Sequence, residues 1–365
     1  MLKQIRLSFL LFLLGVNLLV GVGLLLGAYG QYFSPLAYPY ISVAGLAFPI
    51  FLFLNLLCLI SWLFIKKRYA WVSVAFLLLT GDAFFTYFPF STQSEVKDGN
   101  VLKVLTYNVE LMRCQTDKKG KHVNPIVDYL NDSKADIVCL QEFPVSYEHI
   151  KKGLKSTYPY SKILLSENGL GLACFSKHRI LSGKKIEMDS PGNGAGFFKV
   201  QFGKKEIPLI IVHLESNKLN DDDKKLYEGI LADPQHNIRP NKGKHLARKL
   251  IDAAVMRATQ AEIVADRVKK ADSPYFLVCG DFNDVSLSYS HHVIAKELQD
   301  VYRETSFGPG VTYNEHYMFF RIDHILVGKG YRVLNSKIDR FIDASDHYPF
   351  WCELEIPKDA SNLKK

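Results

Sequence analysis

An apolar run ends abruptly in polar residues at Phe276-Leu277-Val278-Cys279-Gly280-Asp281-Phe282-Asn283. A short, continuous apolar run bounded by a turn residue is typical of a strand buried on both faces. Similar runs occur at residues 101–109, 136–140, 170–176, 207–214 and 322–327. Apolar residues at helical spacing lie between some of them, at 123–131 and 253–270. Strands that dominate, with helices between them, predict an α/β fold with two sheets rather than one doubly wound sheet.

Polar side chains cluster where these predicted strands end. They are carboxylates, amides and imidazoles: Asn108, Glu110, Glu142, His213, Asp281, Asn283, Asp323, Asp346 and His347. Each alone is also compatible with a turn, a helix cap or a satisfied core histidine. Their repetition at several strand ends predicts a single site. Hard oxygen ligands suit Mg²⁺ or Mn²⁺, and nearby histidines indicate metal-assisted hydrolysis of a phosphate ester.

Six motifs carry a family resemblance. They are Thr106-Tyr107-Asn108-Val109, Leu140-Gln141-Glu142, Val212-His213-Leu214, Gly280-Asp281-Phe282-Asn283, Ile322-Asp323-His324-Ile325-Leu326 and Ser345-Asp346-His347. In this order they resemble the endonuclease/exonuclease/phosphatase superfamily, which includes deoxyribonucleases, apurinic endonucleases, inositol polyphosphate phosphatases and neutral sphingomyelinases. The resemblance covers residues 101–356. It implies a four-layered sandwich of two β-sheets flanked by helices.

The resemblance also implies a metal site. Glu142 would bind the divalent cation, with Asn108 close to the cation or to the scissile phosphate and Asp346 as a carboxylate on the metal side. Glu110 stands where some members carry an acid, so it would be a metal ligand or a neighbour of one. The implied cofactor is Mg²⁺, with Mn²⁺ as the alternative. His324 would be structural.

The implied catalytic groups are five. Asp281 would position and activate the attacking water, and Asn283 would hold the phosphate and that water. His347 would contact a non-bridging phosphate oxygen or transfer a proton, and Asp323 would fix its tautomer. His213 would lie on the leaving-group side, as in the nuclease and sphingomyelinase branches.

The N-terminal part of the chain predicts a membrane anchor. No charged side chain occurs between Arg6 and Lys66, and a spanning helix needs about 20 apolar residues. We expect spans at residues 7–28 and 41–65, and a third at 69–88 that contains Asp82. The predicted organisation is therefore an anchor of about three transmembrane helices at 1–90, a linker at 91–100 and a catalytic domain at 101–365.

Basic residues indicate the orientation of this anchor. Lys3 and Arg6 precede the first span, and Lys66-Lys67-Arg68 follow the second. Because cytoplasmic loops are enriched in lysine and arginine, both segments are expected in the cytoplasm. Three spans then place the catalytic domain outside the cytoplasm; if the third does not insert, the domain lies inside.

Charge and cysteine content limit the function classes. The net charge is +8, and residues 1–92 account for half of it, so the remainder is mildly basic. This permits a phosphate-bearing substrate without requiring nucleic acid. Five cysteines after the anchor lack metal or redox spacing and are expected as buried thiols. The polar insertion at 217–250 either borders the site or is a surface loop.

The leading prediction is a membrane-tethered nuclease. The alternatives are a phosphodiesterase acting on phospholipid or sphingomyelin-type headgroups, and a non-catalytic binding module of the same fold. Partners implied are the phosphodiester substrate and the membrane, and no protein partner is evident. Aromatic residues at Tyr313, Tyr317, Phe319 and Phe320 fit a core run better than a substrate-binding surface.

Overall fold

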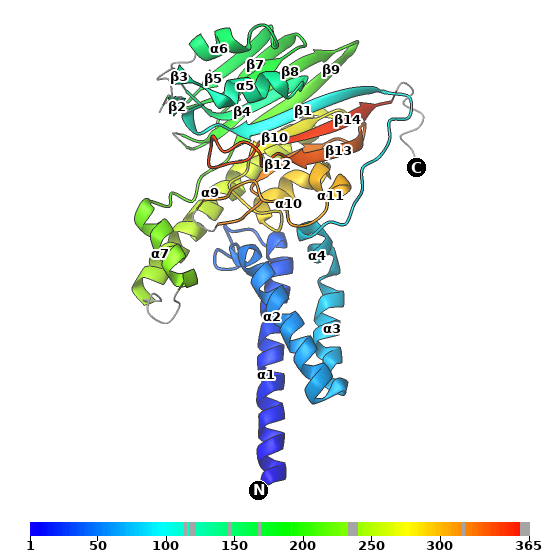
Figure 1. Cartoon of the computed structure of the whole chain (residues 1–365), viewed down its shortest axis with the longest axis vertical. Coiled ribbons are helices and arrows are strands. Elements are labelled where there is room, and N and C mark those ends of the chain that lie inside the picture. The colour runs from blue at the N-terminus through cyan, green and yellow to red at the C-terminus, as the bar shows by residue number, and fades with distance from the viewer. Residues whose placement is uncertain are drawn as a thin grey trace.

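The computed structural model describes residues 1–112, 115–116, 122–144, 148–166, 169–190, 192–232, 240–315 and 318–357. Two β-sheets with helices form one part of the molecule, and a stalk of apolar helices extends from it (Figure 1). The N-terminus lies at the far end of the stalk. Tyr317, which the sequence analysis named, and Cys114, one of the five cysteines after the anchor, lie outside the described residues.

The stalk and the part that contains the sheets contribute separate sets of helices. The helices of the stalk are α1 (Leu2–Tyr29), α2 (Ala44–Ile65), α3 (Ala70–Leu79) and α4 (Gly81–Tyr87). The remaining helices are α5 (Pro125–Asp132), α6 (Glu148–Leu154), α7 (Asp221–Ala232), α9 (Pro240–Ala271), α10 (Tyr289–Ala295) and α11 (Val301–Thr305). The helices expected at 123–131 and 253–270 correspond to α5 and to the second half of α9.

Twelve strands form the two large sheets. The first sheet has the order β13 (Arg332–Ile338), β14 (Phe350–Ile356), β1 (Asn100–Asn108), β4 (Ile137–Phe143), β6 (Gly171–Ser176) and β5 (Tyr160–Leu165). The second has the order β11 (Gln299–Asp300), β12 (Asp323–Val327), β10 (Leu277–Asp281), β9 (Lys205–His213), β8 (Gly194–Phe202) and β7 (Ile180–Ile186). A small pair, β2 (Gln115–Thr116) and β3 (His122–Val123), lies apart.

Strand register brings the polar strand ends together. β1 runs parallel to β4, with Asn108 opposite Gln141, and β10 runs parallel to β9, with Asp281 opposite His213. β12 is antiparallel to β10, so Asp323 also pairs with Asp281. Because the carboxyl ends of parallel strands share one edge of a sheet, each sheet presents its polar residues at one edge.

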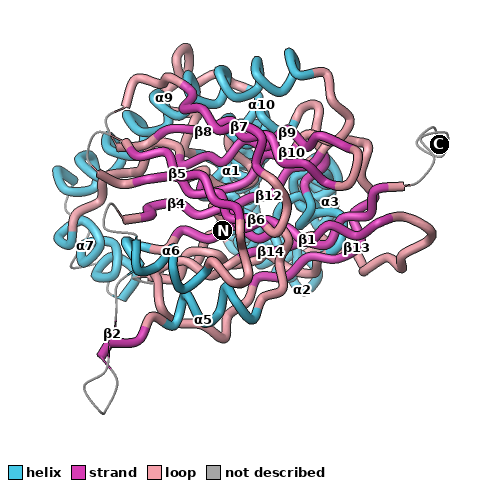
Figure 2. Tube along the Cα trace, turned by 90° about the horizontal axis from the view of Figure 1, so that it is seen from above, coloured by secondary structure: helices cyan, strands magenta, loops and turns pink. Residues whose placement is uncertain are grey.

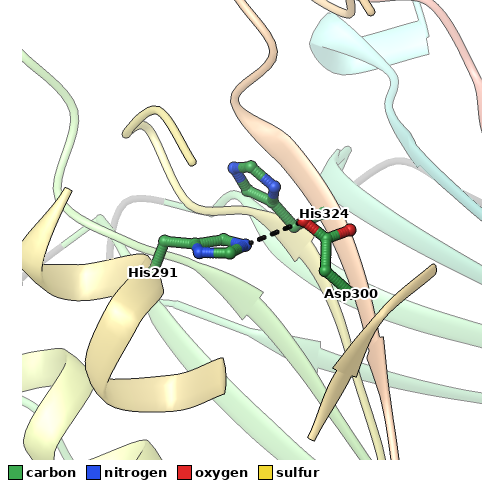
Figure 3. A group of neighbouring side chains, drawn as sticks. All are labelled: His291, Asp300 and His324. Atoms are coloured by element: carbon green, nitrogen blue, oxygen red, sulfur yellow. Dashed lines mark ion pairs between the residues drawn. The ribbon is translucent and has the colours of Figure 1, made fainter. Parts of the chain in front are cut away.

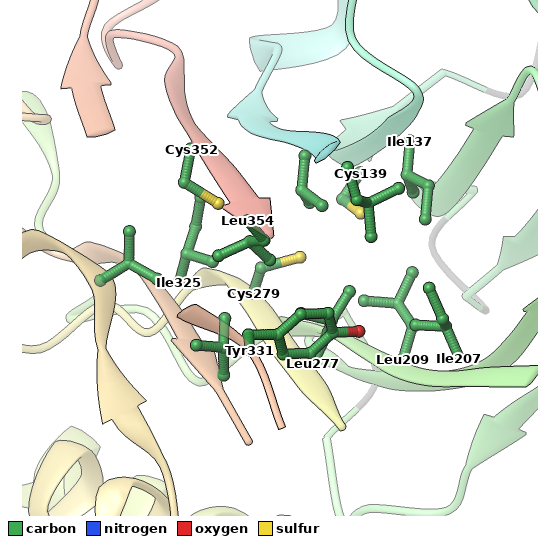
Figure 4. Packing of buried hydrophobic residues seen from close by; sticks show 14 of the residues in the cluster. Ile137, Cys139, Ile207, Leu209, Leu277, Cys279, Ile325, Tyr331, Cys352 and Leu354 are labelled. Atoms are coloured by element: carbon green, nitrogen blue, oxygen red, sulfur yellow. The ribbon is translucent and has the colours of Figure 1, made fainter. Parts of the chain in front are cut away.

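Three apolar layers hold the sandwich together. Between the sheets, alternate residues of both pack against one another, including Cys139, Leu209 and Leu277 (Figure 4). A second cluster lies between the first sheet and helices α5 and α6, and a third between the second sheet and helices α9 and α10. The central strands thus bury both faces, which explains their continuous apolar runs. Figure 2 shows the strands of the two sheets and the surrounding helices from above. The predicted four-layered sandwich is confirmed.

The thiols are buried in these layers. Cys139, Cys174, Cys279 and Cys352 are free and fully buried, and burial raises the pKa of Cys139 and Cys352 well above the ordinary value. A buried neutral thiol behaves as a small apolar side chain. For the described cysteines, the expectation of buried thiols without disulfides is confirmed.

The stalk contains two helices that are long and apolar enough to cross a membrane, α1 and α2. The third predicted span is bent by 63° between α3 and α4, so the count rises to three only if this pair is one span. Asp82 lies in α4, where it forms an ion pair with Arg303 of α11 (2.7 Å). Buried hydrogen bonds connect the helices of the stalk: Trp62 Nε1 of α2 and Ser73 Oγ of α3 both donate to Asn17 Oδ1 of α1.

Candidate active site

Asn108 joins the two sheets at the site. Its Nδ2 donates to Glu142 Oε1 and to Asp281 Oδ2, each at 3.1 Å. Glu142 ends β4 in the first sheet, whereas Asp281 ends β10 in the second. One amide therefore holds a carboxylate from each sheet, and the site lies across the edge of the sandwich.

The backbone has unusual conformations at and beside the residues of the site. Gly280 has φ +136°, and a Cβ there would collide with the Val212 carbonyl, so only glycine fits before Asp281. Glu142 (φ 53°) and Asn283 (φ 51°) also have left-handed conformations. The β4–β6 register shifts between Leu140 and Phe143, next to Glu142. Strained residues and bulges of this kind concentrate at functional sites.

Asp323 and His347 form a buried hydrogen-bonded pair. His347 Nδ1 lies 2.7 Å from Asp323 Oδ2, and its Nε2 lies 3.6 Å from Asp281 Oδ2. Burial acts against the charged imidazole, but the carboxylates of Asp323 and Asp281 raise the pKa of His347 well above its ordinary value. Asp323 therefore fixes the orientation of the ring, and Nε2 faces Asp281. Burial raises the pKa of Asp281 to about 6, although the two neighbouring histidines oppose the rise.

His213 completes the polar cluster from β9. Its Nε2 lies 3.6 Å from Glu142 Oε1 and 3.8 Å from Asp281 Oδ2. Asn193 Nδ2 lies 3.3 Å from the same His213 nitrogen and donates to the Leu214 carbonyl. The sequence analysis did not identify Asn193 as a site residue. The available signal was an amide between two glycines.

Asn283 and the loop after β9 are locked by further hydrogen bonds. The Asn283 backbone N–H donates to Asp281 Oδ1 (2.7 Å), and its Nδ2 donates to the Leu214 carbonyl (2.9 Å). Arg257 of α9 is buried and binds Asp284 Oδ2 (3.0 Å) and the Glu215 carbonyl (2.9 Å). Arg257 thus ties the loop after β9 to the loop after β10, which positions both edges of the site.

Asp346 lines the main pocket of the site, whereas Glu110 does not. Asp346 lines the same pocket as Glu142, and the preceding Ser345 donates to the Asn108 carbonyl (2.8 Å). Glu110 lines a neighbouring surface pocket, shared with Asp346, and its backbone N–H donates to Asn108 Oδ1. Glu110 therefore lies beside the main pocket rather than in its lining.

The donor set fits a hard divalent cation. Carboxylates of Glu142, Asp281 and Asp346 face one pocket. Burial raises the pKa of Asp346, and the nearby Glu142 carboxylate adds to this rise. Crowded carboxylates with raised pKa values are stabilised by a bound cation, and oxygen donors suit Mg²⁺ or Mn²⁺.

The pocket has a polar and an apolar side. Its volume is about 450 Å³, and its polar lining includes Glu142, His213, Asp281, Asn283, Asp346 and His347. Its apolar lining includes residues of α2 and of the segment just before it, together with Leu219, Tyr227, Leu246, Leu250, Met318 and Phe320.

The insertion at 217–250 therefore borders the site, as one of the two sequence expectations stated, and its described part is largely helical. Phe320 and Tyr313 also line the pocket, whereas Phe319 is exposed, so the expectation of a core run is not met there.

A second histidine cluster lies beneath the site. His291 Nε2 lies 3.3 Å from Asp300 Oδ2, with His324 beside them (Figure 3). Arg321 binds Asp300 Oδ2 (3.0 Å) and approaches His324 Nδ1 (3.4 Å), while His324 Nε2 lies 3.0 Å from the Asp284 carbonyl. Both His324 nitrogens are thus engaged, and a guanidinium already neutralises Asp300. The cluster is a buried ion-pair network, in keeping with a structural His324.

Arg321 also connects the part that contains the sheets to the stalk, since its Nη2 donates to the Thr86 carbonyl of α4 (3.2 Å). We expect Arg321→Met to lower the free energy of unfolding by about 3–5 kcal/mol, because it leaves the Asp300 carboxylate buried without its cation. The matched control is Arg303→Met, which breaks the exposed pair with Asp82 and should cost about 0–1 kcal/mol. Denaturant unfolding of the full chain in detergent measures both. Equal, small losses would contradict the assignment.

Models of two protein families match this chain. The model of the Endonuclease/Exonuclease/phosphatase family matches residues 105–347, and that of a domain of unknown function (DUF8431) matches residues 9–87. No curated protein matches the chain.

Solved structures are similar in fold. The human Nocturnin catalytic domain with bound sulfate anion has 14% identity and a TM-score of 0.51, over 70% of this chain and 94% of that one. D. rerio TDP2 complexed with single strand DNA product has 16% identity and a TM-score of 0.50, over 70% and 99%. Sphingomyelinase C from Streptomyces griseocarneus has 14% identity and a TM-score of 0.46, over 70% and 99%. At these identities the likeness concerns the fold alone.

Proposed function

The chain belongs to the endonuclease/exonuclease/phosphatase family, and on that premise we propose that it is a membrane-anchored phosphodiesterase dependent on Mg²⁺ or Mn²⁺. One observation carries the proposal. Carboxylate, amide and imidazole groups from both sheets converge on a single pocket, with the Asp323–His347 pair beside Asp281. A non-catalytic binding module has no need for a buried histidine held between two carboxylates.

The metal is assigned to the carboxylates on the open side of the site. Glu142 would be its main ligand and Asp346 a second carboxylate for it, and Asn108 donates the hydrogen bond that fixes the Glu142 carboxylate. When bound, the cation supplies positive charge to the phosphate oxygens. Glu110 lines the adjacent pocket, so its role is to support residues next to the metal ligands rather than to bind the metal itself.

The remaining groups handle the water and the phosphate. Asp281, held by the Asn283 N–H and Asn108 Nδ2, accepts a hydrogen bond from the attacking water and orients it. His347, protonated and fixed by Asp323, stabilises the negative charge that develops on a non-bridging oxygen. Asn283 holds the phosphate, and His213 faces the leaving group and protonates it.

We further propose an organisation with an anchor at 1–90, a linker at 91–100 and a catalytic domain at 101–365. Lys3 and Arg6 belong to the first turns of α1, whose N-terminus lies at the tip of the stalk, and the connection between α2 and α3 also lies on the side of the stalk that points away from the sheets (Figure 1). By the positive-inside rule this end is cytoplasmic, and the catalytic domain at the other end is extracytoplasmic.

Two substrate classes fit the catalytic groups taken by themselves. Nucleic acid, the first choice from the sequence, would arrive from water. A lipid headgroup phosphodiester would arrive from the membrane. The walls of the pocket, rather than its catalytic groups, distinguish these classes.

Metal removal tests the proposed chemistry. We expect the full chain in detergent to hydrolyse bis-p-nitrophenyl phosphate in the presence of Mg²⁺ or Mn²⁺, and to lose at least about 100-fold in rate after treatment with EDTA. Re-addition of either cation should restore the rate, because the carboxylates alone repel an anionic substrate. Full activity in the metal-free protein would refute the metal-dependent mechanism.

A further inference from the structure

We infer that the substrate is a membrane lipid, whose phosphodiester reaches the catalytic groups while its apolar chain lies against helix α2. The inference rests on the proposed phosphodiesterase activity and names its substrate class. It follows from the walls of the pocket, the depth of α2 in the membrane, and the charges around the site.

Helix α2 and the residue before it are part of the wall of the active-site pocket. Val43, Leu46, Ala47 and Ile50 line the same cavity as the catalytic residues. Helix α9 contributes Leu246 and Leu250 to the same lining. A phosphate held at the polar side would therefore have an apolar surface beside it, which water-soluble diesters do not need.

The length of α2 places this wall within the membrane. The Lys66-Lys67-Arg68 segment limits the hydrocarbon at the cytoplasmic end of α2. The 22 residues from Ala44 to Ile65 extend about 33 Å at 1.5 Å per residue, close to the roughly 30 Å of a bilayer core. Nearly all of α2 is therefore needed to span the bilayer, and Leu46 to Ile50 lie in its outer leaflet.

Aromatic residues mark the same level independently. The connection between α1 and α2 exposes large aromatic side chains: Tyr29, Tyr32, Phe33, Tyr38 and Tyr40. Tyrosine is enriched where a membrane protein crosses the membrane–water interface. This belt ends at Tyr40, three residues before Val43, so the apolar wall of the pocket begins where the headgroup region ends.

The catalytic part is packed tightly against α2. A Cβ on Gly45 would collide with the carbonyl of Leu287, which follows the Asp281–Asn283 turn by four residues. Leu287 is buried in one cluster with Phe48 and Leu52 of α2, and the Tyr32 ring meets the His292 ring edge-on at 4.6 Å. The position of the pocket at the membrane surface is therefore built into the fold.

The charges around the pocket are unfavourable for a polynucleotide. Nucleic-acid binding depends on lysine and arginine side chains that neutralise several phosphates. Among the described residues that line the pocket, the basic ones already have acidic partners: Lys218 with Glu215 (2.6 Å), Lys224 with Glu315 (2.9 Å) and Arg257 with Asp284 (3.0 Å). A single phosphodiester with an apolar chain fits this lining better than a polyanion.

The reaction on such a lipid is a simple hydrolysis. The oxygen of water forms a bond to phosphorus, and one of the two ester P–O bonds breaks. The alcohol on that side leaves with a proton, and the other remains in a phosphomonoester. No oxidant, reductant or second substrate is required.

The test uses the full chain reconstituted in phosphatidylcholine vesicles that contain phosphatidylethanolamine, phosphatidylglycerol and sphingomyelin. Mass spectrometry follows the lipid products, and bis-p-nitrophenyl phosphate and plasmid DNA are assayed in parallel. We expect Leu46→Trp, which fills the apolar side of the pocket, to lower the ratio of lipid to soluble-diester hydrolysis at least tenfold.

Leu57→Trp is the matched control. It lies 11 residues, or about three turns, further along the same face of α2, is exposed, and is absent from the pocket lining. Its ratio should equal that of the wild type. Hydrolysis of the soluble diester or DNA without any lipid cleavage, or an unchanged ratio in Leu46→Trp, would overturn the inference alone. No hydrolysis of any substrate would instead overturn the proposed function.

Discussion

Replacement of His347 by alanine is expected to lower kcat for bis-p-nitrophenyl phosphate by about 1,000-fold, the upper part of the range for a positioned acid–base or charge-stabilising group. His347 is buried, is held by Asp323 at 2.7 Å, and has a raised pKa. Its removal takes away the imidazole that lies nearest to Asp281 among the described residues (3.6 Å, against 3.8 Å for His213). The measurement is steady-state kinetics of the full chain in detergent with Mg²⁺.

Two variants make this result specific. Asp323→Asn keeps the histidine but replaces its charged partner, and it should lose activity to a similar extent because the imidazolium is no longer favoured. His178→Ala removes a histidine that packs on Phe202, away from the site, and should retain wild-type kcat. If His347→Ala is folded, as judged by circular dichroism, and keeps a rate close to that of the wild type, the site is wrongly assigned.

The second large effect is expected at Glu142. Glu142→Gln preserves the shape of the side chain but removes the negative charge that faces the pocket. We expect the Mg²⁺ concentration for half-maximal activity to rise at least tenfold, and the rate at subsaturating Mg²⁺ to fall about 100-fold, since ligand charge sets the affinity for hard cations. A metal titration of activity measures both quantities.

A nearby glutamate provides the control for this substitution. Glu148 begins α6 and is exposed, outside the lining of the pocket. Glu148→Gln should leave the Mg²⁺ requirement unchanged. A Glu142→Gln variant with an unaltered Mg²⁺ requirement would mean that the cation binds elsewhere.

Much of the fold could be predicted from local sequence because the central strands are buried on both faces. The apolar runs that end in Asn108, Glu142, His213 and Asp281 correspond to β1, β4, β9 and β10. The outer strands β5 and β7 escaped prediction because they alternate or mix polar residues, as half-exposed strands do. The helices at 217–250 also escaped, since their polar composition resembles that of a loop.

The site was predictable in its residues but not in its surroundings. Polar groups at strand ends, taken with the six motifs, identified the side chains that the structure brings to one pocket. No sequence pattern indicated that Leu46 and Ile50 of a membrane helix would line that pocket. Such a contact depends on how the stalk packs against the β10–α10 loop, through residues such as Gly45 and Leu287 that are far apart in sequence.

The most direct test of the central claim is ³¹P NMR of vesicles that contain the full chain and the four lipids named above, before and after addition of Mg²⁺. Hydrolysis in the membrane predicts that a phosphodiester resonance declines and a phosphomonoester resonance appears with wild-type protein, but not with His347→Ala or in EDTA. An unchanged lipid spectrum from a protein that cleaves bis-p-nitrophenyl phosphate would contradict a lipid substrate. A phosphomonoester that forms equally with His347→Ala would contradict the assigned site.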